Sequence, residues 1–363
     1  MLIQTPSLLN KIYSRITNRL RSVSVDGIPK GLTFDEINEL CIKHFDDHLV
    51  KVSYEHLSSW KAAGSYRLFL KTKKGIIRRL VYKNAVYNID HIPALQGLPV
   101  IPGNPEYLVY KNARGASATY LPNVYLVKEV IPQKHYQYFL EDLNPKDFTS
   151  AYKPKLSLTV AQKISALHQS MDELLPIVDQ TKLLRYDRRF SLAIEEYFHK
   201  NLESYLQKID NQRIQEIYKL CPRILNLHAR QEFQDLQVSR LIHGDLNGSN
   251  ILIHKKDPDK IKFIDWEWAG LGNPHADLVS LVSSSQLEVE HQALAIFAKQ
   301  NPQLSLSEHK RLYQWCKLER GLLDAAFMTV QQMQSSYQSK FLLSSEFIEN
   351  AMEKILNAYL ELA

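Results

Sequence analysis

The 363-residue chain contains little of what marks a secreted or membrane protein. Its three cysteines, Cys41, Cys221 and Cys316, are scattered, odd in number and without metal-ligand spacing, so we expect reduced thiols and a cytoplasmic location. No run of about 18 apolar residues occurs, so no membrane-spanning helix and no membrane partner are expected. The N-terminus also lacks the charged and then apolar layout of a signal peptide.

Several catalytic motifs are also missing. The sequence has no Gly-x-x-x-x-Gly-Lys-Ser/Thr phosphate loop, no His-Glu-x-x-His zinc pair and no Gly-x-Ser-x-Gly nucleophile elbow. Its 13 histidines show no spacing typical of a metal site. P-loop, zinc-peptidase and serine-hydrolase chemistry are therefore not indicated.

Positive charge is concentrated in the first part of the chain. The net charge is +6, but residues 1–140 alone carry 19 Lys and Arg against 10 Asp and Glu, whereas residues 269–363 carry 7 against 10. A basic N-terminal half could attract nucleic acid. However, the basic residues alternate with apolar ones and form no block, so nucleotide phosphates or ordinary solubility explain the excess equally well. No nucleic-acid partner is predicted.

One segment carries most of the chemical information. The run His243-Gly-Asp-Leu-Asn-Gly-Ser-Asn250 is followed by Ile264-Asp-Trp-Glu267. This spacing suits phosphoryl transfer, in which Asp245 orients an attacking hydroxyl group and takes its proton, while Asn250 and Asp265 hold Mg²⁺ against the phosphates of a nucleotide.

The residues between these motifs predict a hairpin. Two apolar runs, residues 251–254 and 261–264, flank the polar residues 255–260. Because a hairpin brings its two ends together, Asn250 and Asp265 should meet at one metal ion.

These motifs resemble those of the aminoglycoside phosphotransferase and choline kinase family, small-molecule kinases that share the protein-kinase fold. Gly244, where protein kinases have Arg, and Asp265-Trp-Glu in place of Asp-Phe-Gly both favour the small-molecule branch. The match is strong over about residues 240–280. The resemblance also implies that His243 braces the loop backbone and that Asp277 braces the loop from the following helix.

The resemblance implies an α+β, protein-kinase-like fold with two lobes. We expect N-terminal helices in residues 1–48, a small lobe with an antiparallel nucleotide-binding sheet in 49–143, and a larger, mostly helical lobe in 144–363 that holds the catalytic loop and the acceptor site. In the resembled family the residues after the last strand of the small lobe form a hinge that holds adenine. Glu141 and Leu143 occupy that place here.

The N-terminal sequence favours helices and then strands. Apolar spacing predicts a helix over residues 8–20, and the capping box Thr33-Phe-Asp-Glu36 begins a second one that runs toward residue 44. Strands are predicted at residues 49–54, 66–70 and 76–82. Further strands are expected at 124–128 and 136–140, one helix at 158–168, more helix over 175–238, and three or four helices after residue 284.

Three features of the small lobe are candidates for nucleotide contacts. The loop that ends at Ser65 has small residues that could cover phosphates, or it is only a hairpin turn. Lys83, at the end of the third strand, is the candidate for the α/β-phosphate lysine, or else an exposed strand-end residue. Glu106, in the first turn of a helix, either pairs with Lys83 or serves only the helix dipole.

The expected reaction is transfer of the γ-phosphoryl group of ATP or GTP, with Mg²⁺, to a hydroxyl group of a small molecule such as an aminoglycoside, a choline-like amino alcohol or a sugar. A cationic acceptor could lie against Trp266, Glu267, Trp268, Tyr313, Trp315, Glu319 and Asp324, although aromatic residues on helices are usually core. Two other classes stay open: a protein-directed kinase or nucleotidyl transferase on the same fold, and a catalytically inactive nucleotide-binding protein. No protein partner is indicated.

Overall fold

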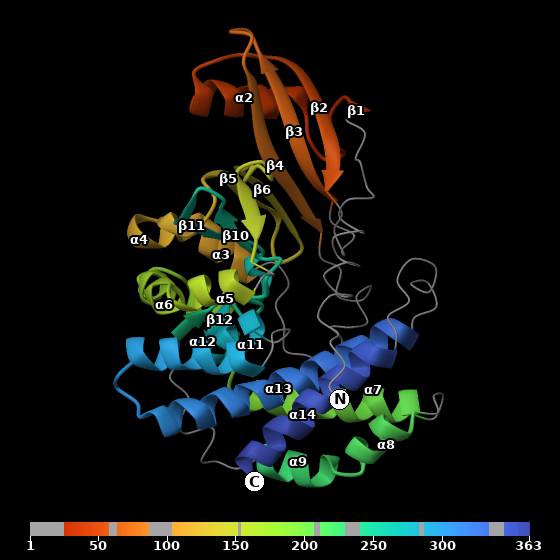
Figure 1. Cartoon of the computed structure of the whole chain (residues 1–363). Helices are drawn as coiled ribbons and strands as arrows, with labels where there is room; N and C mark the ends of the chain where they lie inside the picture. The colour runs from red at the N-terminus through yellow and green to blue at the C-terminus, as the bar shows by residue number, and fades with distance from the viewer. Residues whose placement is uncertain are drawn as a thin grey trace.

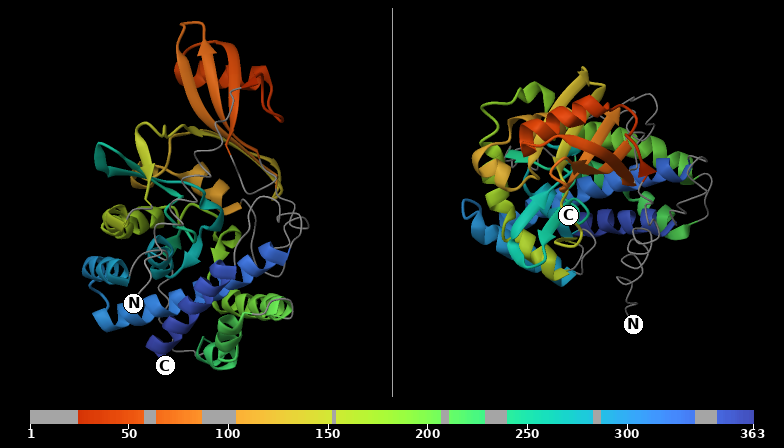
Figure 2. Two further views of the ribbon diagram at one scale, coloured as in Figure 1. Left: turned by 45° about the vertical axis from the view of Figure 1, so that its right-hand side comes forward. Right: turned by 90° about the horizontal axis from the view of Figure 1, so that it is seen from above.

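The chain has an antiparallel sheet at one end and a helical region at the other, with short strands between them (Figure 1, Figure 2). The structure, a computed structural model, describes residues 25–57, 64–86, 104–151, 154–206, 211–228, 240–282, 287–333 and 345–363. The helix predicted at residues 8–20, most of the loop before Ser65 and most of the insert at 84–103 lie outside these residues.

The N-terminal sheet contains six strands in the order β1-β2-β3-β4-β6-β5, and every neighbouring pair is antiparallel. The five predicted strands are confirmed and run further than expected, although the third begins at Ile77 and not at residue 76; the two-residue β1 was not predicted. The strands are β1 (Val25–Asp26), β2 (Leu49–Leu57), β3 (Gly64–Thr72), β4 (Ile77–Val86), β5 (Val124–Ile131) and β6 (His135–Glu141). Gly75, at a φ of 77°, makes the predicted turn between β3 and β4.

Helix α2 (Phe34–Phe45) packs on this sheet. The predicted capping box is confirmed, since Thr33 Oγ1 accepts a bond from the Glu36 backbone N–H at 3.2 Å and Glu36 Oε2 accepts one from the Thr33 N–H at 2.9 Å. Ile37, Leu40 and Cys41 form the buried face of α2 and share a core cluster with the sheet. Residues 25–48 are thereby attached to the sheet through β1 and α2.

Most of the second half of the chain is helical, as expected. One prediction was wrong: the helix expected over residues 158–168 is two helices that are separated at Gln162 and Lys163. The α-helices after the N-terminal sheet are α5 (Pro154–Ala161), α6 (Ile164–Asp172), α7 (Arg188–Leu206), α8 (Gln212–Tyr218), α9 (Cys221–His228), α11 (His275–Val282), α12 (Leu287–Gln300), α13 (Leu306–Met333) and α14 (Ser345–Leu362). The long helix α13 packs against α7, α11 and α14.

Two small sheets connect the sheet and helical parts. One has the order β11-β10-β7 and contains the predicted hairpin, made of β10 (Ile251–His254) and β11 (Asp257–Phe263), beside β7 (Phe148–Ser150). The other has the order β8-β12-β9, with β8 (Leu184–Arg185), β9 (Arg240–Ile242) and β12 (Gly270–Gly272). The sequence did not predict β7, β8, β9 or β12, because strands of two or three residues show no periodicity.

The largest core cluster runs from the N-terminal sheet through the β10-β11 hairpin to helices α11 and α12. All three cysteines are buried and free, as expected. Among the described residues, no helix is both long enough and apolar enough to cross a membrane.

Candidate active site

The catalytic loop, residues 243–250, follows β9 and precedes β10. Gly244 adopts a φ of 77°, where a side chain is rarely tolerated. A Cβ atom at this position would lie 2.1 Å from the Trp268 backbone oxygen and 2.2 Å from the Tyr186 hydroxyl. The glycine at this position is therefore required by the close packing of the loop on its neighbours.

Asp277, on α11, braces the loop as the resemblance implied. Its carboxylate accepts the backbone N–H groups of His243 and Gly244, both at 2.8 Å, and the Nε2 atom of His168 at 2.9 Å. Asp277 is fully buried. Burial by itself would raise the pKa of Asp277, but the hydrogen bond and charge of His168, together with His243, hold that pKa below its ordinary value.

His243 also braces the backbone, as expected. Its Nε2 atom lies 2.9 Å from the Ile264 carbonyl oxygen and donates to it, while Nδ1 accepts the Asp245 backbone N–H at 3.3 Å. The imidazole ring packs on Trp266 with the ring centroids 4.5 Å apart. With both nitrogens used by the backbone, His243 links the catalytic loop to the start of the Asp265 segment.

The carboxylate of Asp245 receives bonds from two directions. Asn247 and Asn250 donate to its Oδ2 atom at 3.0 and 3.2 Å, and Asn250 also donates to its backbone oxygen at 2.8 Å. From the other side, the Nη2 atom of Arg320 donates to Oδ1 at 3.0 Å. Asp245 therefore has a fixed orientation while its side chain stays about a quarter exposed.

Lys83 lies inside β4, which continues to Val86, rather than at the end of the strand. Its Nζ atom contacts Glu106 at 2.8 Å, Asp265 at 2.9 Å and Glu267 at 2.8 Å. Glu106 lies in the first turn of helix α3 (Asn104–Asn112), which begins at the predicted position. Its side chain is buried. The pairing of Lys83 with Glu106 is thus present, although a helix-dipole interaction of the glutamate is compatible with it.

The hairpin brings the ends of its strands together. Ile251 pairs with Phe263, and the Ile264 backbone N–H donates to the Asn250 carbonyl at 3.0 Å. Asp265 follows in the left-handed region at a φ of 66°, an uncommon backbone conformation for a non-glycine residue. Asn250 and Asp265 accordingly line the same cavity.

This cavity has a volume of about 1200 Å³ and lies where the sheet meets the helices. Every residue predicted to contact nucleotide, metal or the acceptor hydroxyl lines it: Ser65, Lys83, Glu106, Glu141, Leu143, Asp245, Asn250 and Asp265. Ser65 is the cross-strand partner of Lys83. Glu141, the last residue of β6, is held by backbone and side-chain bonds to Asn123 at 2.8 and 3.0 Å.

The far end of the cavity is formed by α7, α13 and the Trp268 segment. Trp268, Glu319 and Asp324 line it, together with Phe190 and Phe327. By contrast, Trp266, Tyr313 and Trp315 are core residues with at most 2% of their surface exposed. The expectation that helix aromatics are usually core therefore holds for these three, while other candidates of that group line the cavity.

Arg320 is the residue that the sequence analysis missed. Besides Asp245, its guanidinium group contacts Asp324 at 2.8 Å and the Gly244 carbonyl at 3.3 Å. Burial opposes its charge, but Asp324 and Asp245 raise the pKa of Arg320 above its ordinary value. The Arg320-Asp324 spacing of four residues is visible in the sequence, but such pairs usually lie on an exposed helix face.

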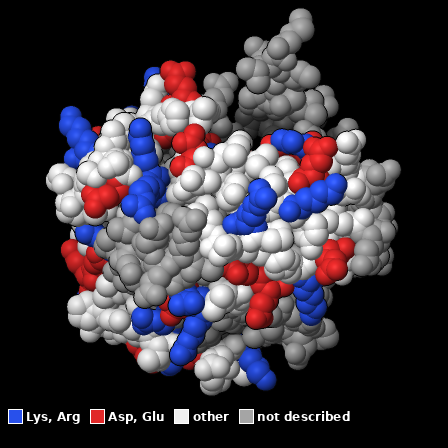
Figure 3. All heavy atoms as spheres, turned by 90° about the horizontal axis from the view of Figure 1, so that it is seen from below, with Lys and Arg blue, Asp and Glu red and all other residues white. Residues whose placement is uncertain are grey.

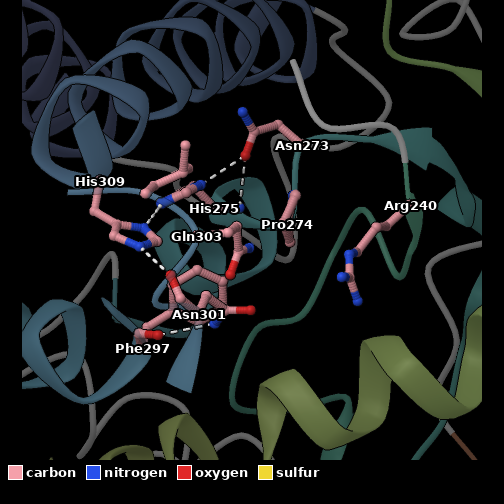
Figure 4. Close-up of a pocket in the computed structure, with 9 residues that line it drawn as sticks. Arg240, Asn273, Pro274, His275, Phe297, Asn301, Gln303 and His309 are labelled. Atoms are coloured by element: carbon pink, nitrogen blue, oxygen red, sulfur yellow. Dashed lines mark hydrogen bonds between the residues drawn. The ribbon is translucent and has the colours of Figure 1, made fainter. Parts of the chain in front are cut away.

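A second cavity is much smaller, about 10 Å³, and none of the predicted site residues lines it. Figure 4 shows its row of hydrogen bonds, in which His275 contacts Asn273 at 2.7 Å and His309 at 2.9 Å, and His309 contacts the Asn301 carbonyl at 2.9 Å. Burial, followed by the charges of His309 and His168, lowers the pKa of His275 to about 3. This cavity holds buried polar side chains and stands apart from the catalytic loop.

The sheet, the helical region and the cavity between them have the two-lobed arrangement of the protein-kinase-like fold. The family model described as the phosphotransferase enzyme family, with the short name APH, matches residues 110–314, more than half of the chain. The chain belongs to this family. This match confirms the resemblance to the aminoglycoside phosphotransferase family.

Solved structures support the fold. An aminoglycoside 2'-phosphotransferase in complex with GDP is 13% identical, with a TM-score of 0.56 and coverage of 91% of this chain and 100% of that one. A spectinomycin phosphotransferase in complex with ADP and spectinomycin is 14% identical, with a TM-score of 0.56 and coverage of 92% and 100%. The choline kinase LicA from Streptococcus pneumoniae is 15% identical, with a TM-score of 0.51 and coverage of 90% and 99%.

A curated relative, a LicA homolog from Metamycoplasma hominis, is 27% identical over 129 residues. The aligned part covers 35% of this chain and 49% of the relative, so the chain spans about half the length of the curated relative that it matches.

Proposed function

We propose that the protein transfers the γ-phosphoryl group of ATP or GTP to a hydroxyl group of a small molecule. The observation that carries this proposal is the shared cavity, which places Asp245 at the same opening as Lys83 and Asp265. Phosphoryl transfer requires a positioned acceptor and neutralised phosphate charge more than covalent catalysis. These groups supply both requirements.

The nucleotide would lie between the sheet and the β10-β11 hairpin. In this proposal Lys83 contacts the α/β-phosphates and is oriented by Glu106, while the backbone of residues 141–143 faces the base. Bound structures of similar proteins contain ADP or GDP, which supports a nucleotide at this place. Because one similar protein binds GDP and another binds ADP, we propose either GTP or ATP as the phosphoryl donor.

The donor set suits Mg²⁺. Carboxylate oxygens of Glu106, Asp265 and Glu267 lie within 4.8 Å of one another, and Asn250, with its amide oxygen, lines the same cavity. Mg²⁺ prefers oxygen ligands and shares them with substrate phosphates. Asn250 and Asp265 would hold the ion, with Asp265 about half exposed to the cavity. The ion would neutralise charge on the phosphate oxygens.

Asp245 would act as the base at the acceptor end. An acceptor hydroxyl group that donates to its carboxylate is oriented toward the γ-phosphate and gives up its proton as the new bond forms. Asn247, Asn250 and Arg320 fix the carboxylate for this purpose.

The acceptor end favours a cationic, hydroxylated molecule. Trp268, Phe190 and Phe327 supply aromatic surface, and Glu319 supplies negative charge, while Asp324 is paired with Arg320. Aromatic faces and carboxylates attract ammonium groups. We therefore propose an amino alcohol or an aminoglycoside as acceptor, in line with the acceptors named for the similar kinases.

Lysine, arginine and acidic side chains are interspersed on the face shown in Figure 3. Buried free cysteines fit the reducing conditions of the cytoplasm, which we propose as the location.

A screen for ADP and GDP release tests the function, with Mg·ATP and Mg·GTP offered to a library of amines, aminoglycosides and sugars. We expect acceptor-dependent release that the Asp245→Asn variant lacks. Full turnover by that variant would remove Asp245 as the base. Release with protein substrates alone would favour a protein-directed kinase, and nucleotide binding without turnover would favour an inactive protein.

A further inference from the structure

The catalytic loop provides no positive charge of its own. Between Asp245 and Asn250 the chain has only Leu, Asn, Gly and Ser. In phosphoryl transfer, negative charge spreads over the oxygens of the transferred group, and one well-placed arginine can raise the rate by about 10³ to 10⁵. Lys83 Nζ is bound by three carboxylates, those of Glu106, Asp265 and Glu267. A cation at the acceptor end must therefore come from outside the loop.

Arg320 lies at that position. It projects from the middle of α13, and its Nη2 atom is 3.0 Å from the Asp245 carboxylate. Three further contacts fix the planar group: Asp324 accepts from Nε at 2.8 Å, and the Gly244 carbonyl and Ser280 hydroxyl lie 3.3 Å from Nη1. The side chain stays about a quarter exposed and lines the cavity.

The guanidinium group of Arg320 neutralises nearby negative charge. Asp245 and Asp324 flank it with two negative charges. Without Arg320, a phosphoryl group that approaches Asp245 would be repelled by the Asp245 carboxylate and by the neighbouring Asp324, whose charge Lys354 offsets in part. The arginine removes most of this repulsion, and its helix holds it in place before substrate arrives.

We propose that Arg320 is a catalytic residue that contacts the transferred phosphoryl group, and that its bonds to Gly244 and Asp245 also position the base. This inference rests on the proposed function. In the step, a bond forms between the acceptor hydroxyl oxygen and the γ-phosphorus, and the bond from that phosphorus to the bridging oxygen breaks. The electron pair leaves with the nucleoside diphosphate, the hydroxyl proton goes to Asp245, and Arg320 keeps its protons throughout.

The test compares Arg320→Ala, Arg320→Lys and Asp324→Asn in the full-length chain. For Arg320→Ala we expect kcat to fall by about 10² to 10³, the loss typical when one fixed electrostatic group is removed. The KM for nucleotide should change less than about threefold, because the Lys83 contacts remain. Arg320→Lys should recover only part of kcat, since an ammonium group cannot bridge Gly244, Asp245 and Asp324 together. Asp324→Asn, which keeps the cation and loses its anchor, should show the smallest loss.

Rescue separates direct contact from a structural role. Guanidinium ion added to Arg320→Ala should raise kcat in a saturable manner, whereas sodium at equal ionic strength should not. Arg213→Gln is the matched control, because Arg213 pairs with Glu353 at 2.5 Å outside the cavity. It should keep wild-type kcat with or without guanidinium. Titration with ADP and thermal unfolding establish that each variant is folded.

Three outcomes overturn the inference: Arg320→Ala with kcat within about threefold of wild type, a loss of kcat that guanidinium does not restore in a folded variant, or an equal rescue of the Arg213 control. If Arg320→Ala does not fold, a kcat for Arg320→Lys equal to wild type overturns it. Failure of the proposed function looks different, because then the wild-type protein itself transfers no phosphoryl group to any acceptor.

Discussion

Replacement of Asp277 by asparagine tests whether the brace behind the catalytic loop controls both folding and catalysis. The carboxylate accepts three hydrogen bonds of 2.8 to 2.9 Å in a fully buried setting. Hydrogen bonds to a charged group contribute about 1.5 to 3 kcal/mol each. Asparagine has nearly the same shape, but its amide nitrogen must face a donor whichever way it turns. We expect a loss of about 3 to 5 kcal/mol in the free energy of unfolding, the cost typical of breaking a buried charged pair.

Catalysis should also suffer, because the His243 and Gly244 backbone amides set the position of Asp245. A displacement of about 1 Å in a reacting group can reduce the rate about 10²-fold. Urea denaturation measures the loss in the free energy of unfolding, and initial rates with a confirmed acceptor measure the loss in kcat. Asp179→Asn is the control, since the exposed Asp179 accepts bonds from Thr181 and lies 3.8 Å from Lys182, so its replacement should leave stability close to wild type. Wild-type stability and kcat in Asp277→Asn would refute the bracing role.

The stability of the same variant should also depend on pH differently from that of the wild-type protein. Because the folded pKa of Asp277 lies below its ordinary value, ionised Asp277 stabilises the fold above the unfolded pKa. This contribution is lost as the pH falls through the folded pKa. Asp277→Asn should therefore lose less stability on acidification than the wild-type protein does.

Three further predictions concern other parts of the site and its surroundings. Lys83→Met removes the cation among three carboxylates and should weaken ADP binding by about 10- to 100-fold in calorimetry, from the 1.5 to 3 kcal/mol of a charged hydrogen bond; unchanged affinity would exclude Lys83 from the nucleotide site. Gly244→Ala forces a Cβ atom to within 2.2 Å of Trp268 and Tyr186 at a positive φ and should destabilise the fold by about 2 to 4 kcal/mol in urea, so a wild-type midpoint would contradict the packing described. The pKa of His275 in the folded state is about 3 and its ordinary value is 6.5, so the contribution of neutral His275 to folding stability is complete above pH 6.5 and is lost as the pH falls toward 3. Between these values the free energy of unfolding should fall by up to about 1.4 kcal/mol per pH unit. A His275→Gln variant whose stability falls equally steeply with pH would disprove the assignment.

Local signals in the sequence predicted the parts of the fold that depend on neighbouring residues. The capping box at Thr33 and the hairpin around residues 255–260 both formed as expected, because each depends on short-range bonds and turn chemistry. The hairpin then determined the site, since it fixes the separation of Asn250 from Asp265. The residues proposed for the base and the metal, Asp245, Asn250 and Asp265, were thus readable from one segment of the sequence, residues 243–267.

The parts that failed depend on contacts far apart in the chain. Helix α13 shows which of its faces is apolar, but its sequence does not say that Arg320 reaches a loop 75 residues earlier. The break at Gln162 and Lys163 likewise lies in a segment with continuous helical spacing, where tertiary packing of α5 and α6 overrides local preference. Acceptor residues were the least predictable, because core and cavity aromatics have the same local pattern.

The β8-β12-β9 sheet has a consequence for local unfolding and for how specificity can change. Its central strand joins β8, just before α7 at the acceptor end, to β9, just before the catalytic loop. A Cβ atom at Gly270 would lie 2.5 Å from the Leu184 oxygen, so the two segments meet only because this residue has no side chain. Backbone amides of β8, β12 and β9 should therefore exchange with solvent as one cooperative unit. A bulky residue at Gly270 should therefore disturb the start of α7 at the acceptor end and the catalytic loop together.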